Sequence, residues 1–216
     1  MKSILIIGIG RFGKHLATYF SELGNEVMVV DQDEAAVEDL ASIVTTTHIG
    51  DCKDPEVIRM LGVNNFDLCF VCIGDDFQSS LEVTSLLKEH DAKYVVSKAE
   101  RDVHAKFLLR NGADEVIYPE HDMARKTSRR FSARNVFDYM EITPEYAVFE
   151  IPVPASWAGK SPGELAIRAR YNINVVATKT DSRVTPLTNP NRPFNPEEHL
   201  LVIGLQKDLI KTLDRL

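Results

Sequence analysis

The chain has 216 residues, of which 44% are hydrophobic and 26% charged, a composition typical of a globular protein with room for one domain and a smaller second one. Its net charge of -7 argues against nonspecific binding to nucleic acid or anionic lipid, since both favour a basic surface. The sequence shows neither an apolar run of about 18 residues nor a signal peptide, so we expect a cytoplasmic protein without a membrane span.

Six short β-branched apolar runs alternate with amphipathic stretches in the first part of the chain, which predicts parallel strands joined by helices. The predicted strands are residues 3–8, 26–31, 44–50, 67–74, 94–99 and 115–119. The predicted helices are residues 12–23, 34–41, 56–61, 79–90, 103–111 and 122–134. Right-handed crossovers then give an α/β fold, a Rossmann-like doubly wound parallel sheet whose ligand crevice lies beyond the carboxyl ends of the strands.

The last part of the chain has a different pattern, which predicts a small α+β lobe. Its predicted strands are residues 146–154, 173–180 and 200–204, with helices at residues 164–170 and after Gln206 and a proline-rich connection at residues 185–196. The excess of acidic residues lies in the first 139 residues, with 23 Asp and Glu against 16 Lys and Arg, whereas the remainder holds 9 of each. These shifts predict two domains, residues 1–135 and residues 136–216.

A glycine-rich loop, Gly8-Ile9-Gly10-Arg11-Phe12-Gly13, follows the first predicted strand and opens the first predicted helix. In this context the G-x-G-x-x-G pattern is typical of dinucleotide-binding folds. The first glycine permits a tight turn, the second lets a phosphate approach the backbone, and the third allows the helix to pack closely on the strand. The loop therefore predicts a phosphate site at the helix N-terminus.

Other polar residues fall at the carboxyl ends of the neighbouring strands. Asp31 ends the second strand, where its carboxylate can accept hydrogen bonds from both hydroxyls of an adenosine ribose, which favours NAD or an adenine nucleotide over NADP. Arg11 at a helix start opposes the helix dipole and is expected to need an anion nearby. Asp51, Gly74 and Lys98 follow or end the next strands and are expected at the rim of the same crevice.

Three cysteines make no disulfide framework and suit a reducing compartment. Cys69 and Cys72 form a C-x-x-C within a predicted strand, where a spacing of three residues sends the two side chains to opposite faces. We therefore interpret both as core residues.

Residues for catalysis are harder to find than residues for binding. The six histidines are scattered, and neither G-x-S-x-G nor G-x-x-x-x-G-K-[ST] occurs. The sequence therefore favours a nucleotide binder whose output is a change of shape, and predicts that the protein is not an enzyme. The alternative is an NAD-dependent oxidoreductase that uses the C-terminal lobe as its substrate domain. A redox-sensing transcription factor would need a basic recognition helix, which the sequence does not show.

Several longer motifs point to one family. They are ILIIGIGRFGKHLA, EVMVVD, IGD-x-x-D-P-E, GADEVIYPEHDMA, LAIRARYNINVVA and LLVIG. Together they cover nearly the whole chain, which resembles the regulator-of-potassium-conductance (RCK) domain family, in particular the KtrA- and TrkA-type cytosolic gating subunits of bacterial potassium uptake systems. The resemblance implies an N-terminal Rossmann lobe, a crossover helix and an RCK C-terminal lobe. It also implies a homodimer that assembles into an octameric ring, held at the inner face of the plasma membrane by a potassium-translocating membrane subunit.

The resemblance also implies the ligand and its contacts. Together with the glycine-rich loop, it gives the candidate cofactor-binding residues Gly8, Ile9, Gly10, Arg11, Phe12, Gly13, Asp31, Gln32, Asp51, Cys52, Ile73, Gly74 and Lys98. In KtrA-like members the residue matching Arg11 reaches a terminal phosphate, so that ATP and ADP favour different ring shapes. TrkA-like members are similar but are taken to bind NAD or NADH, and Asp31 does not separate these ligands. The GRFG start favours ATP and ADP.

Two further sites follow from the resemblance. Glu120 matches a glutamate that helps to hold a divalent cation, Mg²⁺ or Ca²⁺, between subunits, although proline followed by acidic residues is also how helices begin. One carboxylate is too few for either ion, so oxygens of a second subunit, phosphate or water would complete its shell. Arg168 and Asn174 match positions that bind cyclic di-AMP in some members. Asn172 stands where glycine is common, and the insertion Thr185–Pro196 departs from the family pattern.

Overall fold

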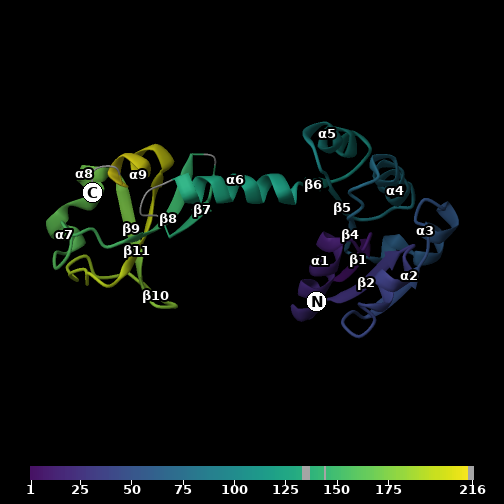
Figure 1. Ribbon diagram of the computed structural model, residues 1–216, viewed down its shortest axis with the longest axis horizontal. Coiled ribbons are helices and arrows are strands. Elements are labelled where there is room, and N and C mark those ends of the chain that lie inside the picture. The colour runs from purple at the N-terminus through teal and green to yellow at the C-terminus, as the bar shows by residue number, and fades with distance from the viewer. Residues whose placement is uncertain (133–136, 144, 214–216) are drawn as a thin grey trace. The chain divides into compact units, whose positions relative to one another are not determined.

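The computed structural model describes residues 1–132, 137–143 and 145–213. The chain divides into two compact units, Met1–His121 and Asp122–Leu216, both drawn in Figure 1. Helix α6 (Pro119–Ser132) leads from the first unit into the second. The boundary predicted between residues 135 and 136 lies outside the described residues and stays a prediction.

The first unit contains a six-stranded parallel sheet with the strand order β3-β2-β1-β4-β5-β6. Its strands are β1 (Ser3–Ile7), β2 (Glu26–Asp31), β3 (Thr46–Ile49), β4 (Leu68–Val71), β5 (Val95–Lys98) and β6 (Glu115–Ile117). All six match predicted runs, and the order reverses direction between β1 and β4. This confirms the predicted Rossmann-like sheet and places its topological switch point beside the glycine-rich loop.

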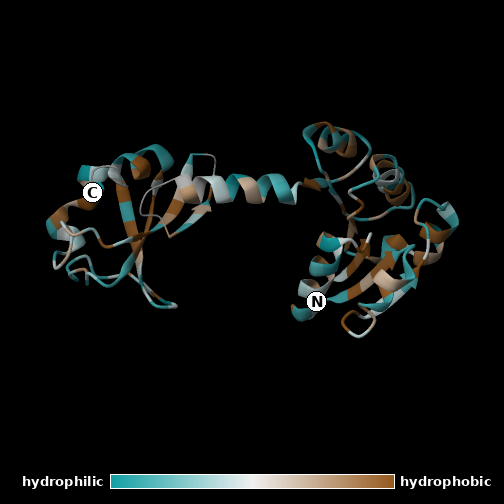
Figure 2. Ribbon diagram, viewed as in Figure 1, coloured by the Kyte–Doolittle hydropathy of each residue, from teal (hydrophilic) through white to brown (hydrophobic). Residues whose placement is uncertain are grey.

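Helices cover both faces of this sheet. They are α1 (Arg11–Glu22), α2 (Glu34–Glu38), α3 (Pro55–Leu61), α4 (Phe77–Glu89) and α5 (Asp102–Arg110), with the 3-10 helix η1 (Val63–Asn65) after α3. Residues of α1 and of the α2 region pack with one face of the sheet, whereas residues of α3 and α4 pack with the other. In Figure 2 the strands of this unit are largely brown, and its helices are partly brown and partly teal. A half-buried helix face on each side is what the predicted amphipathic stretches require.

The three cysteines belong to this core. Cys69 packs in the cluster on one face of the sheet and Cys72 in the cluster on the other, which confirms their assignment to opposite faces. Cys52, Cys69 and Cys72 are all buried and free. Burial raises the pKa of each thiol to about 12, so all three stay protonated at neutral pH.

Some helices begin earlier than predicted because of local capping. The Asp76 side chain accepts a hydrogen bond from the Ser79 backbone N–H and starts α4 at Phe77, two residues before the predicted start. Helix α6 begins at Pro119 rather than at Asp122, with proline in the first position that its missing N–H suits. Glu120 therefore lies in the first turn of α6.

The second unit holds a five-stranded antiparallel sheet with the order β10-β9-β11-β8-β7. Its strands are β7 (Asp138–Glu141), β8 (Tyr146–Pro152), β9 (Ile173–Thr180), β10 (Arg183–Pro186) and β11 (His199–Leu205). Helices α7 (Pro162–Leu165), α8 (Ile167–Tyr171) and α9 (Gln206–Leu213) complete it. This confirms the predicted α+β lobe.

Three details of the second unit differ from the prediction. The two edge strands, β7 and β10, were not predicted, and β10 takes in the first residues of the expected proline-rich connection. Proline is tolerated there because an edge strand has one side free of ladder hydrogen bonds. The predicted helix at residues 164–170 is broken by Ala166, whose φ of 49° lies in the left-handed region. Asn172, which stands where glycine is common in the family, also lies in the left-handed region with a φ of 55°, and asparagine is one of the residues that enter this region.

Within the part of the chain that the structure describes, no helix combines the length and the apolar character needed to cross a lipid bilayer.

Candidate functional site

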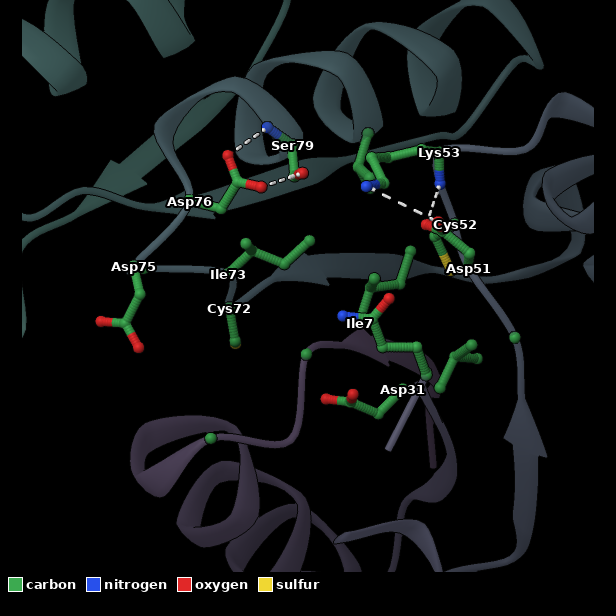
Figure 3. Close-up of a pocket in the computed structure, with 17 residues that line it drawn as sticks. Ile7, Asp31, Asp51, Cys52, Lys53, Cys72, Ile73, Asp75, Asp76 and Ser79 are labelled. Carbon is green, nitrogen blue, oxygen red and sulfur yellow. Dashed lines mark hydrogen bonds and ion pairs between the residues drawn. The ribbon is translucent and has the colours of Figure 1, made fainter. Parts of the chain in front are cut away.

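A pocket of about 330 Å³ opens in the first unit beyond the carboxyl ends of the strands (Figure 3). Eight of the predicted nucleotide contacts line it, namely Gly8, Gly10, Asp31, Gln32, Asp51, Cys52, Ile73 and Gly74. They come from the loops after β1, β2, β3 and β4, so the sheet brings together residues up to 66 positions apart in the sequence. Its place at the switch point is where open α/β sheets bind ligands, and its volume is in the usual range of such sites.

The three glycines of the loop have different roles. Gly8 has a φ of +92°, and a Cβ there would lie 3.1 Å from the backbone of Cys72 and Ile73. A Cβ on Gly13 would overlap the carbonyl oxygen of Gly8. Gly10, by contrast, lines the pocket, and a Cβ there would meet no atom within 4 Å. Protein packing therefore accounts for Gly8 and Gly13, whereas the open space at Gly10 fits a bound group that approaches the backbone.

The N-terminus of α1 is open to an anion. Gly10 is the N-cap residue and offers no capping side chain, and the first turn holds no acidic residue. The first backbone N–H groups of a helix have no partner within the helix, and its N-terminus carries a partial positive charge. Together with the open space at Gly10, this arrangement suits the phosphates of a nucleotide.

Asp31 connects the end of β2 to the glycine-rich loop. Its Oδ2 accepts a hydrogen bond from the Ile9 backbone N–H at 2.6 Å, and its Oδ1 accepts one from the Asp33 N–H at 3.0 Å. The carboxylate also lines the pocket, where its remaining lone pairs can accept ribose hydroxyls. It thus fixes the loop and presents free lone pairs to the pocket.

Lys98 lies beside the pocket without lining it. Its Nζ is 3.6 Å from a Glu100 carboxylate oxygen and 3.2 Å from one of Glu120, and Lys98 as a whole is only 8% exposed. A Cβ on Gly74 would be 3.1 Å from this Nζ and would overlap the Glu100 carboxylate. The side chains of Lys98 and Glu100 therefore fill the space next to Gly74, on the β5 side of the crevice, and Glu120 pairs with Lys98.

Glu120 is held as a carboxylate by this arrangement. Burial acts to raise the pKa of Glu120, but hydrogen bonds from its own backbone N–H and from Lys98, with the charges of Lys98 and Arg11, lower it below the usual value. Glu120 thus forms an ion pair with Lys98, a cation of the same unit. Among the described residues, no three His, Cys, Asp or Glu side chains gather as metal ligands. The divalent cation at Glu120 stays a prediction.

The remaining predicted contacts lie around the pocket. Ile9 and Phe12 pack against the core, and buried Gly13 lets α1 lie against the loop, so these residues position the loop. Arg11 is exposed at the first position of α1 and lies close enough to Glu120 to lower its pKa.

The two predicted effector residues lie in the second unit. Arg168 is in α8 and Asn174 is in β9, where it is paired with Ile203 of β11. Both side chains are exposed. The cyclic di-AMP site stays a prediction.

Four polar residues that sequence reasoning missed also line the pocket: Lys53, Asp75, Asp76 and Ser79. Lys53 donates its backbone N–H to Asp51 at 3.0 Å, and its Nζ is 3.6 Å from the same carboxylate. Hydrogen bonds from Ser79 hold the pKa of Asp76 below its usual value. Figure 3 shows these two pairs on the upper side of the pocket. All four residues follow β3 or β4, so their place after a strand was the signal that could have found them.

The pocket lining is acidic overall, since it holds four aspartates and one lysine. A nucleotide's phosphates would therefore be attracted by local donors, namely the N-terminus of α1, Arg11 and Lys98, and not by a general positive field.

Comparisons with known proteins agree with this architecture. The TrkA-N domain matches residues 4–119, and the TrkA-C domain matches residues 146–216. Ktr system potassium uptake protein C of Bacillus subtilis is 38% identical over 96% of this chain and 94% of its own length. Ktr system potassium uptake protein A of the same organism is 32% identical over the same shares of the two chains.

Solved structures show the same fold. The GsuK channel bound to NAD matches with a TM-score of 0.66 and 18% identity, over 100% of this chain and 39% of the channel chain. The GsuK RCK domain matches with a TM-score of 0.65 over 96% of this chain and 46% of the other. The chain has the fold of the GsuK RCK domain, and its two matched domains and full-length relatives show that it belongs to the family of Ktr potassium uptake proteins with a TrkA-N and a TrkA-C domain.

Proposed function

We propose that this chain is a nucleotide-binding regulatory subunit of a potassium uptake system and that it switches a membrane-embedded, potassium-translocating partner without catalysing a reaction. The observation that carries the proposal is the open space at Gly10, over the uncapped N-terminus of α1. Asp31 accepts a hydrogen bond from Ile9 in the same glycine-rich loop. The Ktr names of its full-length relatives support the potassium uptake system.

ATP and ADP are the ligands proposed for this pocket. In a Rossmann fold a dinucleotide crosses the switch point, so its second nucleoside lies on the far side of the crevice from the first. On that side, Lys98 and Glu100 occupy the space beside Gly74, and Lys98 also pairs with Glu120. An adenosine with a chain of phosphates would lie on the side formed by the loops after β1, β2 and β3, and only its terminal phosphate would extend toward Arg11 and Lys98. NAD and NADH are the competing ligands, and the GsuK channel was solved bound to NAD.

Arg11 is assigned the contact with the terminal phosphate. It is the first residue of α1, at the uncapped N-terminus, and its positive charge helps to lower the pKa of Glu120. A two-state ring needs about 5.5 kcal/mol of differential binding to pass from mostly closed to mostly open. Shared over eight subunits this is under about 1 kcal/mol each, less than one charge-assisted hydrogen bond provides.

The assembly is proposed from the same family membership. Homodimers would form an octameric ring in the cytoplasm, at the inner face of the plasma membrane, and the angle between paired domains would follow the bound nucleotide. Glu120 would hold Mg²⁺ or Ca²⁺ together with oxygens of a neighbouring subunit, after exchanging its contact with Lys98. Cyclic di-AMP would bind across the C-terminal lobes at Arg168 and Asn174.

Calorimetric titration of the full chain with ATP, ADP, NAD and NADH tests the proposal. We expect saturable heat with ATP and ADP, and we expect Arg11→Ala to bind ADP nearly as the wild type does while losing the preference for ATP. Lys14→Ala is the matched control, because Lys14 lies one turn further along α1 and pairs with Asp39 at 2.7 Å. Equal loss of ATP and ADP in Arg11→Ala would contradict the role of Arg11. Absence of heat with all four nucleotides would overturn the proposal.

An absorbance assay at the nicotinamide band tests the oxidoreductase alternative. We expect no sustained turnover of NADH with small carbonyl substrates, and steady turnover would favour the alternative.

A further inference from the structure

A second pocket of about 680 Å³ lies within the second unit, between the turn that joins β9 to β10 and the segment that leads into β11. We call it the hairpin pocket; its lining residues are Thr178, Thr180, Asp181, Ser182, Arg183, Thr185, Arg192 and Glu198. Neither Arg168 nor Asn174 is among them. Part of its wall comes from the insertion at residues 185–196, which departs from the family pattern.

The floor of the hairpin pocket is polar and buried. Thr178 is 3% exposed and Glu198 is 5% exposed. The guanidinium of Arg192 forms a bidentate ion pair with the carboxylate of Glu198: Nη1 donates to one carboxylate oxygen at 3.1 Å, and Nη2 donates to the other. The backbone N–H of Asn195 also donates to this carboxylate, at 3.3 Å. Hydrogen bonds from Arg192 hold the pKa of Glu198 below its usual value. Glu198 is therefore a fully engaged carboxylate that fixes the wall of the pocket.

The hydroxyl of Thr178 is in a different position. Within the described residues it has no hydrogen-bond partner, although the residue is almost fully buried and lines the pocket. The hydroxyl is not sealed from the pocket, so water or a ligand in the pocket can complete its hydrogen bonding. The pairing of Thr178 with Thr185 across β9 and β10 places a second hydroxyl directly beside it.

The rest of the wall adds donors of the same kind. Thr180 is paired with Arg183 across the same two strands, so a hydroxyl-bearing residue and an arginine are neighbours in the pocket lining. In the described part of the chain, Arg183 makes no ion pair. Asp181 lies in the turn with a φ of 53° and also lines the pocket.

This set of groups selects a chemical class of ligand. Hydroxyl groups and a guanidinium without a partner are donors for tetrahedral oxyanions, and arginine suits phosphate in particular because it donates two parallel hydrogen bonds. Glu198 does not oppose such an anion strongly, because Arg192 already balances its charge. The volume exceeds that of a bare phosphate ion, and Asp181 supplies an acceptor for a hydroxyl of the remainder of a ligand.

We propose that the hairpin pocket binds a small phosphorylated metabolite, whose phosphate is held by Arg183 and by the hydroxyls of Thr178 and Thr185. The site is separate from the nucleotide pocket, since all its residues belong to the second unit. The proposal does not depend on which nucleotide the first unit binds.

Inorganic phosphate is the probe for a first test on the full chain, with ADP present in excess to occupy the first unit. Phosphorus NMR line broadening reports binding of phosphate. The fluorescence of the single tryptophan tests whether phosphate binds in the second unit. Trp157 packs there against Phe194 with ring centroids 6.3 Å apart, and Phe194 lies between the pocket residues Arg192 and Glu198 in the chain. Sodium chloride at matched ionic strength is the control for screening.

The variants Thr178→Val and Arg183→Gln carry the test, and Arg170→Gln is the matched control because Arg170 is an exposed arginine of α8 outside the pocket. We expect saturable broadening with the wild type and with Arg170→Gln, and about tenfold weaker binding in each pocket variant, as loss of one such hydrogen bond predicts. Arg183 is exposed, so its variant is expected to fold even if Thr178→Val does not. Lack of saturation in the wild type, or equal binding by all four proteins, would overturn the proposal.

Discussion

Gly10→Ala is expected to show that glycine is needed at this position for ligand binding and not for stability of the fold. Gly10 has a φ of -65° and a ψ of -177°, which alanine adopts readily, and a Cβ there meets no protein atom within 4 Å. Alanine is a poorer N-cap than glycine by a few tenths of a kcal/mol or more, but it lowers the entropy of the unfolded chain by a similar amount, about 0.4–1 kcal/mol. We therefore expect the free energy of unfolding to change by less than about 1 kcal/mol.

The effect on binding is expected to be much larger. A methyl group at Gly10 would occupy the space through which phosphate reaches the backbone N–H groups of α1. Loss of one charge-assisted hydrogen bond costs about 1.5–3 kcal/mol, which corresponds to a loss of ADP affinity of about ten- to a hundredfold. Urea unfolding measures the stability of Gly10→Ala, and calorimetric titration measures its affinity for ADP.

Gly13→Ala is the matched comparison. Its Cβ would overlap the Gly8 carbonyl oxygen, so backbone must move, and we expect a loss of about 3 kcal/mol or more, although alanine is the better helix former by about 1 kcal/mol. Normal ADP affinity in a well-folded Gly10→Ala protein would refute the assignment of the open space to phosphate. Wild-type stability of Gly13→Ala would refute the account of loop packing.

Three other expectations follow from single contacts. Asp31→Asn should weaken ADP binding and lower stability by about 1 kcal/mol, seen by calorimetry and urea unfolding, because the Ile9 N–H loses a charged acceptor at 2.6 Å; an unchanged affinity would contradict the role of this residue. Hydrogen bonds from Arg192 depress the pKa of Glu198, so its carboxylate stabilises the folded state above the unfolded value near 4.5 and this stability is lost as pH falls through the folded-state pKa. Glu198→Gln should therefore flatten the fall in stability below about pH 5, and an equally steep fall would exclude Glu198 as a source. Ala166→Gly should raise the melting temperature, because the left-handed conformation costs alanine roughly 1 kcal/mol and glycine adopts it without this strain. A lower melting temperature would contradict this.

The parallel sheet and the centre of the nucleotide pocket were predictable because their signals are local in the sequence. The glycine-rich loop is contiguous, and Asp31 directly ends an apolar run whose period marks a strand. Once strands are parallel, their carboxyl ends meet at one edge, so Asp51 and Gly74 follow from topology. The same rule also applied to Lys53, but a charged residue after a strand is common, and nothing in its sequence context set it apart.

The features that were missed depend on contacts between distant residues. Strand β7 has no strong hydrophobic alternation of its own and forms a strand by pairing with β8 at the sheet edge. The break at Ala166 is invisible to helix periodicity, because alanine is the best helix former and tertiary packing overrides that preference. The contact between Lys98 and Glu120 joins residues 22 positions apart, and it appears only when β5 and the start of α6 lie together.

The covered, protonated state of the three native thiols has a practical consequence. Because Cys52, Cys69 and Cys72 are buried and their pKa values lie near 12, maleimide dyes at neutral pH should leave them unmodified. A cysteine introduced on an exposed position of each unit would then take up a fluorophore selectively, without prior removal of the native ones. Distances between two such dyes could be followed by energy transfer during addition of ATP or ADP, in the otherwise unaltered protein.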